Sequence, residues 1–190
     1  MEEIIRNNIE KHKKLVTQFE NNAPQMLIKI TMLITDSFKH EGCLYLCGNG
    51  GSAADAQHVA GEFVGRFRKE RKPLPAIALN ADTSILTCIG NDYSYKEIFA
   101  RQVEAMMKPK DILWAFSTSG KSPNILAAAE AAKTKGAKIV AFTGKENSKL
   151  ENLSDLCLCA ASNEPSSAQE IHQLAYHIIC GLVEDLITNS

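Results

Sequence analysis

The first 40 residues contain no glycine, and their apolar positions recur three to four apart, the spacing of one helix face. Ala23-Pro24 interrupts this pattern, because proline disfavours helix at the preceding residue and suits the first position of a new helix. The pattern therefore predicts two helices ahead of the first strand. Such an N-terminal helical extension, 1–40, either packs on a neighbouring subunit or covers its own domain.

From residue 42 onward, short apolar runs alternate with longer runs of helical spacing. The apolar runs predict strands at Leu44–Cys47, Ala76–Leu79, Ile112–Phe116, Ile139–Phe142 and Leu156–Cys159. The other runs predict helices at Ala53–Val64, Thr83–Ile89, Ile98–Met107, Pro123–Thr134, Ser148–Leu153 and Ser166–Ile187. This alternation is typical of an α/β fold, here a five-stranded parallel sheet flanked by helices. Ligands of such folds bind beyond the C-terminal ends of the strands.

Charge and composition narrow the range of partners. Lys and Arg number 21 against 22 Asp and Glu, which gives a formal net charge of −1 over 190 residues. A protein that binds nucleic acid or an acidic membrane through bulk charge carries an excess of basic residues, so we expect neither partner. The acidic N-terminus is unlike a secretory signal, and no run approaches the roughly 20 apolar residues of a membrane span. The 6 cysteines form no CxxC pair and indicate reduced core thiols in a cytoplasmic protein.

A glycine loop, Gly48-Asn49-Gly50-Gly51-Ser52, follows the first predicted strand directly. It formally matches a dinucleotide-binding fingerprint, but the acidic residue expected at the end of the second strand is missing, and Asp82 is the nearest acid after it. A nicotinamide site is therefore disfavoured. The safer interpretation is that the glycines allow backbone amides to approach a ligand at a helix N-terminus.

A serine loop, residues 117–123 with the sequence STSGKSP, follows the third predicted strand. Ser122 suits a helix N-cap and Pro123 the first helical position, so a helix begins here. Four hydroxyls, a glycine and the positive end of that helix then converge, which suits a phosphate group without an arginine clamp. The alternative is a turn whose serines only cap the helix.

Histidines on two predicted helices are candidates for a metal or for acid–base chemistry. His58 and Glu62 lie four apart, hence on one helix face, just beyond the glycine loop. Gln169, His172 and His177 lie on the last predicted helix. A surface His–Glu pair is the alternative for the first helix, and a hydrogen-bonded boundary histidine is the alternative for His172.

Three segments of the sequence resemble the SIS (sugar isomerase) domain family and, within it, the phosphoheptose isomerases. They are residues 47–66 (CGNGGSAADAQHVAGEFVGR), 116–122 (FSTSGKS) and 169–177 (QEIHQLAYH). Stretches 74–79 and 90–93 are also similar, so the resemblance covers nearly the whole chain. It implies a single SIS domain, 1–190, that includes the extension 1–40.

The resemblance also implies roles for individual residues. Asn49, Gly50, Gly51 and Ser52 would hold a sugar, Ser117, Thr118, Ser119 and Ser122 its phosphate, and Asn91 and Asp92 its hydroxyls. His58, Glu62, Gln169 and His177 match the family's zinc site, with one ion per active site. Glu62 and His177 match its acid–base pair, and Glu62 and Gln169 would also contact substrate.

The implied reaction converts D-sedoheptulose 7-phosphate to D-glycero-D-manno-heptose 7-phosphate, the first step toward heptose for bacterial surface polysaccharide. An aldose–ketose shift through an enediol requires a base for the carbon proton and an acid for the oxygen, and a metal can polarise the carbonyl. The sequence leaves open which of Glu62 and His177 takes the carbon proton.

Helix geometry adds an expectation about Gln169 and His177. They are eight residues apart, hence about 12 Å along one helix. We therefore expect either a site shared between subunits or a Gln169 that mainly contacts substrate. The resemblance implies a homotetramer, and the N-terminal helices offer it a surface.

Two other functions compete with the enzyme. Some SIS proteins bind the replication initiator protein and have no known catalysis; that group lacks counterparts of Glu62 and His177, which this chain has. A sugar-phosphate-sensing regulatory domain usually accompanies a DNA-binding domain, for which 190 residues leave no room.

Overall fold

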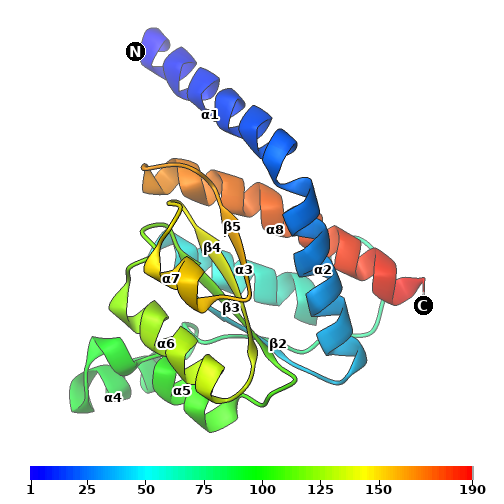
Figure 1. The fold of residues 1–190 in the computed structure, drawn as a ribbon, viewed down its shortest axis with the longest axis vertical. Helices are drawn as coiled ribbons and strands as arrows, with labels where there is room; N and C mark the ends of the chain where they lie inside the picture. The colour runs from blue at the N-terminus through cyan, green and yellow to red at the C-terminus, as the bar shows by residue number, and fades with distance from the viewer. Residues whose placement is uncertain (190) are drawn as a thin grey trace.

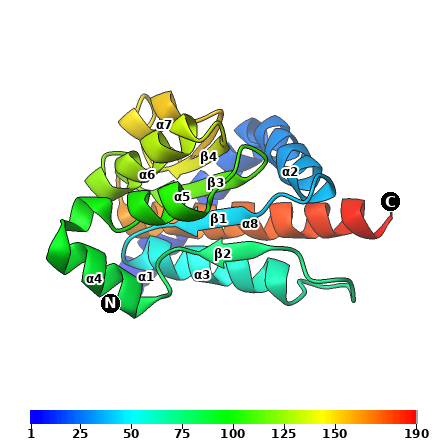
Figure 2. The same ribbon diagram turned by 90° about the horizontal axis from the view of Figure 1, so that it is seen from below.

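The computed structural model describes residues 1–189 as a parallel five-stranded sheet between two layers of helices (Figures 1 and 2). The strands are β1 (Leu44–Cys47), β2 (Ala76–Ala78), β3 (Ile112–Ser117), β4 (Lys138–Thr143) and β5 (Leu156–Cys159). The helices are α1 (Glu2–Asn22), α2 (Pro24–Lys39), α3 (Gly51–Val64), α4 (Thr83–Asp92), η1 (Tyr95–Glu97), α5 (Ala100–Met106), α6 (Pro123–Thr134), α7 (Lys149–Leu153) and α8 (Pro165–Thr188). The spatial order of the strands is β2-β1-β3-β4-β5, with every neighbouring pair parallel.

The central strand β3 shows why the strand sequences are apolar throughout. Trp114 and Phe116 face a core built with α2, α3 and α8, whereas Leu113 and Ala115 face a core built with α5, α6 and α7. Helices thus cover both faces of the sheet, as Figure 2 shows. Because successive side chains on a strand point to opposite faces, both sets must be apolar.

The two helices of the N-terminal extension have different surroundings. Helix α2 packs on the sheet and α8, and buries Ile30 and Ile34 completely. Helix α1 has no fully buried residue and projects away from the sheet in Figure 1, with Ile4 65%, Ile5 59% and Ile9 50% exposed. The extension therefore covers its own domain through α2 and the C-terminal half of α1, but leaves the apolar face of the N-terminal half of α1 open.

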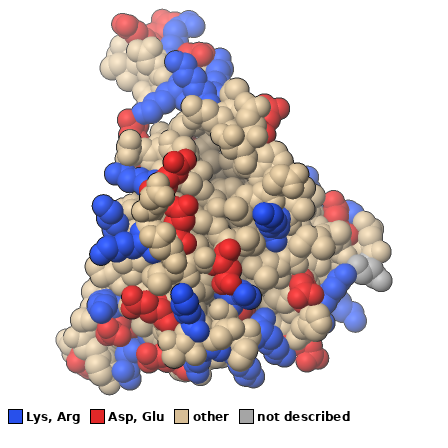
Figure 3. All heavy atoms as spheres, in the orientation of Figure 1, with Lys and Arg blue, Asp and Glu red and all other residues tan. Residues whose placement is uncertain are grey.

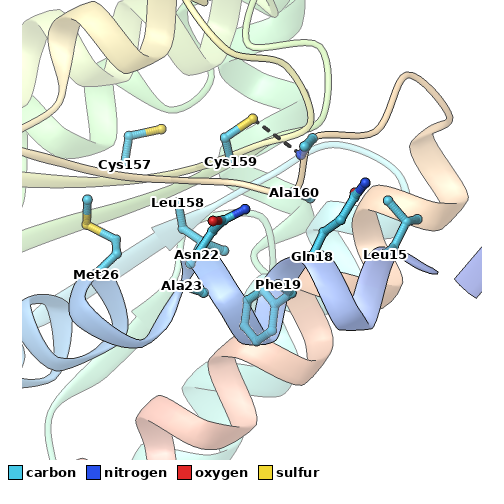
Figure 4. Close-up of a pocket in the computed structure, with 11 residues that line it drawn as sticks. Leu15, Gln18, Phe19, Asn22, Ala23, Met26, Cys157, Leu158, Cys159 and Ala160 are labelled. Carbon is cyan, nitrogen blue, oxygen red and sulfur yellow. Dashed lines mark hydrogen bonds between the residues drawn. The ribbon is translucent and has the colours of Figure 1, made fainter. Parts of the chain in front are cut away.

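A cavity of about 400 Å³ lies where the junction of α1 and α2 meets β5 (Figure 4). Phe19, Met26, Cys157 and Leu158 are among its lining residues, and Figure 4 shows no histidine in it. It contains none of the residues that the sequence singled out for chemistry.

The predicted fold is confirmed, and the differences are local. β1, β5 and α6 have the predicted bounds. The helix predicted at 98–107 is α5, slightly shorter at both ends and preceded by a 3₁₀ turn at 95–97, and α4 extends to Asp92. These are differences at helix ends, where capping and tertiary contacts outweigh periodicity.

The cysteine prediction was only partly right. All six are free thiols, and Cys47 and Cys180 are buried, but Cys88 is exposed and the other three are half-buried. Within residues 1–189, no helix is both long and apolar enough to span a membrane. Lys, Arg, Asp and Glu are interspersed over the face shown in Figure 3, in line with the balanced composition.

Candidate active site

The glycine loop joins β1 to α3, and hydrogen bonds between two side-chain amides hold it in place. Asn49 and Asn124 exchange hydrogen bonds of 2.9 and 2.8 Å between their side chains, and the Tyr95 hydroxyl donates to Asn49 Oδ1 at 2.9 Å. Gly50 has φ +57°, and a Cβ at Gly48 would lie 2.2 Å from the Ser52 carbonyl oxygen. The loop therefore requires both glycines and exposes backbone at the start of α3.

The serine loop gathers three hydroxyls at the start of α6. Ser117 Oγ lies 3.2 Å from Ser122 Oγ and 3.5 Å from Ser119 Oγ. Ser122 is the N-cap residue of α6 as predicted, yet its hydroxyl makes no capping hydrogen bond. The hydroxyls thus cluster with one another in front of a helix N-terminus, an arrangement that suits an anion.

The sharp turn of the serine loop depends on Gly120. Its φ is +60°, and a Cβ there would lie 2.3 Å from the Ser148 Cβ. The Thr118 carbonyl accepts a hydrogen bond from the Gly144 amide, which ties the loop to the end of β4. The shape of the loop is therefore fixed by Gly120 and by this hydrogen bond to the end of β4.

Packing of α3 against α8 brings together His58, Glu62 and His177. Their potential ligand atoms all lie within 4.8 Å of one another. His58 Nε2 is 3.0 Å from Glu62 Oε1 and 3.5 Å from His177 Nε2. We call these three residues the triad. Residues 58 and 177 are 119 apart in sequence, so only the helix packing creates it.

Tyr176 and Asp55 lie on the side of His58 that faces away from Glu62 and His177, and they orient its ring. The Tyr176 hydroxyl lies 3.1 Å from His58 Nδ1 and 3.5 Å from Asp55 Oδ1. The Tyr176 hydroxyl can donate its proton to the Asp55 carboxylate while it accepts a hydrogen bond from His58 Nδ1–H. The lone pair of His58 is then on Nε2, the nitrogen that faces Glu62 and His177. Burial raises the pKa of Asp55 to about 6.

His177 lies between two aromatic rings. Phe67 stacks on it with ring centroids 5.6 Å apart and planes at 17°, and Tyr176 meets it edge-on at 4.7 Å. Burial first, and the neighbouring His58 second, lower the pKa of His177. Its imidazole is therefore neutral at pH 7 and able to accept a proton or bind a cation.

The triad fits a divalent metal ion. Two imidazole nitrogens and one carboxylate oxygen are ligand types that zinc takes, with a further position left for water or substrate. Lone pairs of His58 and His177 that face each other at 3.5 Å repel unless a proton or a cation lies between them. The contact from Tyr176 to His58 Nδ1 is the outer support that metal-binding histidines commonly have.

Other residues singled out by the sequence lie around these features. The Gln169 side chain packs against Gly51, where an added Cβ would lie 2.6 Å from its Oε1. Gly51 precedes His58 by seven residues, so Gln169 lies about 10 Å along α3 from the triad. Asn91 and Asp92 are exposed at the end of α4 and hydrogen-bond to each other at 2.9 Å. His172 is fully buried and bonds to the Thr143 carbonyl at 3.0 Å.

Sequence reasoning missed several supporting residues. Tyr176 could have been found from its position beside His177, and Asp55 from its position three residues before His58 on the same helix face. Nothing in the sequence pattern indicated that Phe67 would stack on His177 or that Asn124 would pair with Asn49. Those contacts join segments that are distant in the chain.

Comparison with known proteins identifies the relatives of this chain. The SIS domain family model matches residues 8–144. A phosphoheptose isomerase of Roseiflexus sp. is 51% identical over 87% of this chain and 83% of the relative, and one of Nitratiruptor sp. is 42% identical over 97% and 99%.

A solved structure agrees with the sequence relatives. A phosphoheptose isomerase from Francisella tularensis superposes with a TM-score of 0.93 at 33% identity, over 96% of this chain and 97% of the other. The chain therefore belongs to the SIS domain family and, within it, to the phosphoheptose isomerases.

Proposed function

We propose that this protein isomerises D-sedoheptulose 7-phosphate to D-glycero-D-manno-heptose 7-phosphate and so begins heptose supply for a bacterial surface polysaccharide. The observation that supports it most is the convergence of Glu62 and His177 from two helices, within 4.8 Å. The names of the relatives agree with this substrate. The proposal treats residues 1–190 as one SIS domain.

The acid–base chemistry is assigned to Glu62 and His177. One of them removes a proton from C1 of the open-chain ketose, and the pair returns a proton to C2 while the hydroxyl proton moves from O1 to O2. No atom is gained or lost, as an isomerisation requires. The neutral His177 and the half-buried Glu62 can exchange protons because their polar atoms lie side by side.

Substrate recognition is assigned to the loops at the strand ends. The hydroxyls of Ser117, Ser119 and Ser122 and the start of α6 would hold the phosphate. Thr118 belongs to the same loop, and Gly50, Gly51 and Ser52 at the start of α3 would hold the sugar together with Gln169, Asn91 and Asp92. Both amide groups of Asn49 and Asn124 are already engaged with each other, so Asn49 would act mainly through its backbone.

A zinc ion is part of the proposal, with His58, Glu62 and His177 as ligands. When bound, it would polarise the substrate carbonyl and stabilise the developing enediolate. Gln169 of the same chain lies against Gly51, so its role as a zinc ligand would require a subunit other than the one that supplies His177.

A homotetramer with shared active sites completes the proposal, in the cytoplasm. It is supported by the apolar face of α1, where Ile4, Ile5 and Ile9 are each at least half exposed. Apolar patches of that kind are typical of interfaces between subunits.

The experiment is to incubate the purified protein with sedoheptulose 7-phosphate, with and without zinc, and to follow aldose formation. We expect turnover by the wild type and its loss in Glu62→Gln and His177→Gln. Absence of turnover in the wild type, or unchanged turnover in both variants, would reject the enzyme. A replication-initiator-binding protein would give the first of these results.

A further inference from the structure

The segment that links α3 to β2 is clamped onto α8 by a buried carboxylate. Glu184, 2% exposed, accepts backbone N–H bonds from Phe67 at 3.0 Å, Arg68 at 2.8 Å and Lys69 at 2.8 Å. Three amides on one carboxylate fix the path of this segment, because charge-assisted hydrogen bonds are the strong ones.

Arg71 clamps the other side of the same segment. Its guanidinium is 3% exposed and lies 3.3 Å from Glu184. It donates to the carbonyls of Glu62 at 2.7 Å and Phe63 at 2.8 Å, and to the carbonyl of Gly65 at 3.2 Å. These carbonyls end α3 and have no partner within the helix. Arg71 therefore joins the C-terminal end of α3, including the backbone of Glu62, to Glu184 on α8.

The clamped segment places the Phe67 ring against His177 of the triad. His177, Gly181 and Glu184 are spaced four and three apart, so they lie along one face of α8. An added Cβ at Gly181 would lie 3.4 Å from the Phe67 ring. The absence of a side chain at Gly181 therefore leaves the space in which the ring packs on α8. From there Phe67 stacks on His177.

We propose that Arg71 and Glu184 are positioning residues: they clamp the 65–72 segment so that Phe67 holds the His177 imidazole opposite Glu62. The inference rests on the proposed function for its effect on turnover. In the contacts above, neither side chain touches a side chain of the triad; Glu184 acts through the segment that holds Phe67, and Arg71 also through the backbone carbonyl of Glu62. A poorly held imidazole costs rate more than binding, because only correctly oriented groups react.

The test uses Phe67→Leu, which keeps apolar volume but removes the stacked ring, and Phe67→Tyr, which restores the ring. We expect Phe67→Leu to lower kcat about tenfold with KM within about twofold, and Phe67→Tyr to recover most of kcat. Glu184→Gln should act in the same direction. Should it fail to fold, because it leaves the Arg71 charge buried and unpaired, Arg71→Lys takes its place: it keeps a cation beside Glu184 but loses the guanidinium fork that reaches the carbonyls of Glu62 and Phe63.

A second readout is independent of turnover. Diethyl pyrocarbonate modifies accessible imidazoles, and peptide mass spectrometry would give the rate at His177. We expect Phe67→Leu to raise that rate several-fold and Phe67→Tyr to leave it near the wild-type value.

Asp111→Asn is the matched control. Asp111 is also a buried carboxylate that accepts two backbone N–H bonds, from Cys43 at 2.9 Å and Lys108 at 2.7 Å, but at the start of β3, the end of that strand opposite the serine loop. It should lower stability without changing the His177 modification rate. The inference is overturned if Phe67→Leu or a folded Glu184→Gln leaves that rate and kcat at wild-type values, or if Asp111→Asn changes the rate equally. An inactive wild type in which Phe67→Leu still raises the rate would reject the proposed function but not the clamp.

Discussion

The serine loop and the triad are built in opposite ways. The hydroxyls of Ser117, Ser119 and Ser122 come from six consecutive residues, and their cluster forms at the start of α6. His58 and His177 are 119 residues apart and meet only because α3 packs on α8. The first site is therefore a property of a local sequence, whereas the second is a property of helix packing.

Because of this difference, we expect the two regions to respond differently when one side chain is removed. A loop of neutral donors and backbone amides loses one hydrogen bond at a time. A cluster of interacting titratable groups acts as a unit, so that removal of one member disables the others. The following predictions test whether the two regions behave in these two ways.

The largest effect is expected in the triad. Glu62→Gln and His177→Gln should each lower kcat about 10²- to 10⁴-fold, and the double variant should cost little more than the worse single one. Steady-state kinetics of aldose formation would show this. The exposed Glu104→Gln on α5 is the control. Multiplicative effects of the two substitutions would contradict a triad that acts as a unit.

A smaller effect is expected behind the triad. Tyr176→Phe removes the hydroxyl that contacts His58 and Asp55, and should weaken Co²⁺ binding about 10- to 100-fold, the usual cost of losing an outer hydrogen bond to a metal ligand. Titration of the metal-free protein, followed by Co²⁺ absorption, measures it. Equal affinities for the variant and the wild type would show that Tyr176 only fills space.

The serine loop should respond more weakly. Ser119→Ala removes one hydroxyl from the cluster and should raise KM for the sugar phosphate about tenfold, with kcat nearly unchanged. Inhibition by inorganic phosphate should weaken by the same factor. Ser154→Ala, whose hydroxyl bonds to the Glu151 carbonyl at the end of α7, is the control. A fall in kcat instead of a rise in KM would break the comparison.

The smallest effect concerns His172 on α8, which lies outside both regions and hydrogen-bonds to the carbonyl of Thr143 at the end of β4. Burial lowers the pKa of His172 to about 4, so the folded protein keeps it neutral while the unfolded chain takes up a proton below about 6.5. Stability is then complete above pH 6.5 and falls as the pH drops toward 4. Between pH 7 and 5.5 the loss should be about 1 kcal/mol.

Urea unfolding of the wild type and His172→Gln at both pH values tests this. Glutamine can still donate to the Thr143 carbonyl but does not titrate, so the variant should lose about 1 kcal/mol less than the wild type over that interval. Identical pH dependence of the two proteins would contradict a neutral His172 in the folded state.

Most of the fold could be predicted from the sequence. Strands β1 and β5 and helix α6 have the bounds that their apolar runs and the Ser122-Pro123 pair indicate. The break at Ala23-Pro24 separates α1 from α2 as expected. The helix predicted at 98–107 is found as α5, but its start was less predictable, because a 3₁₀ turn precedes it and packing decides where such a helix begins.

The sequence by itself determined the loops and the identity of the reactive side chains, because glycine, proline and hydroxyl residues act on the backbone within a few positions. Tertiary structure decided which of those side chains meet. It brought Glu62 to His177, turned Gln169 toward Gly51 instead, and placed Phe67 and Tyr176 around the histidine. Contacts between segments more than 100 residues apart depend on how whole helices pack, and no local pattern records that packing.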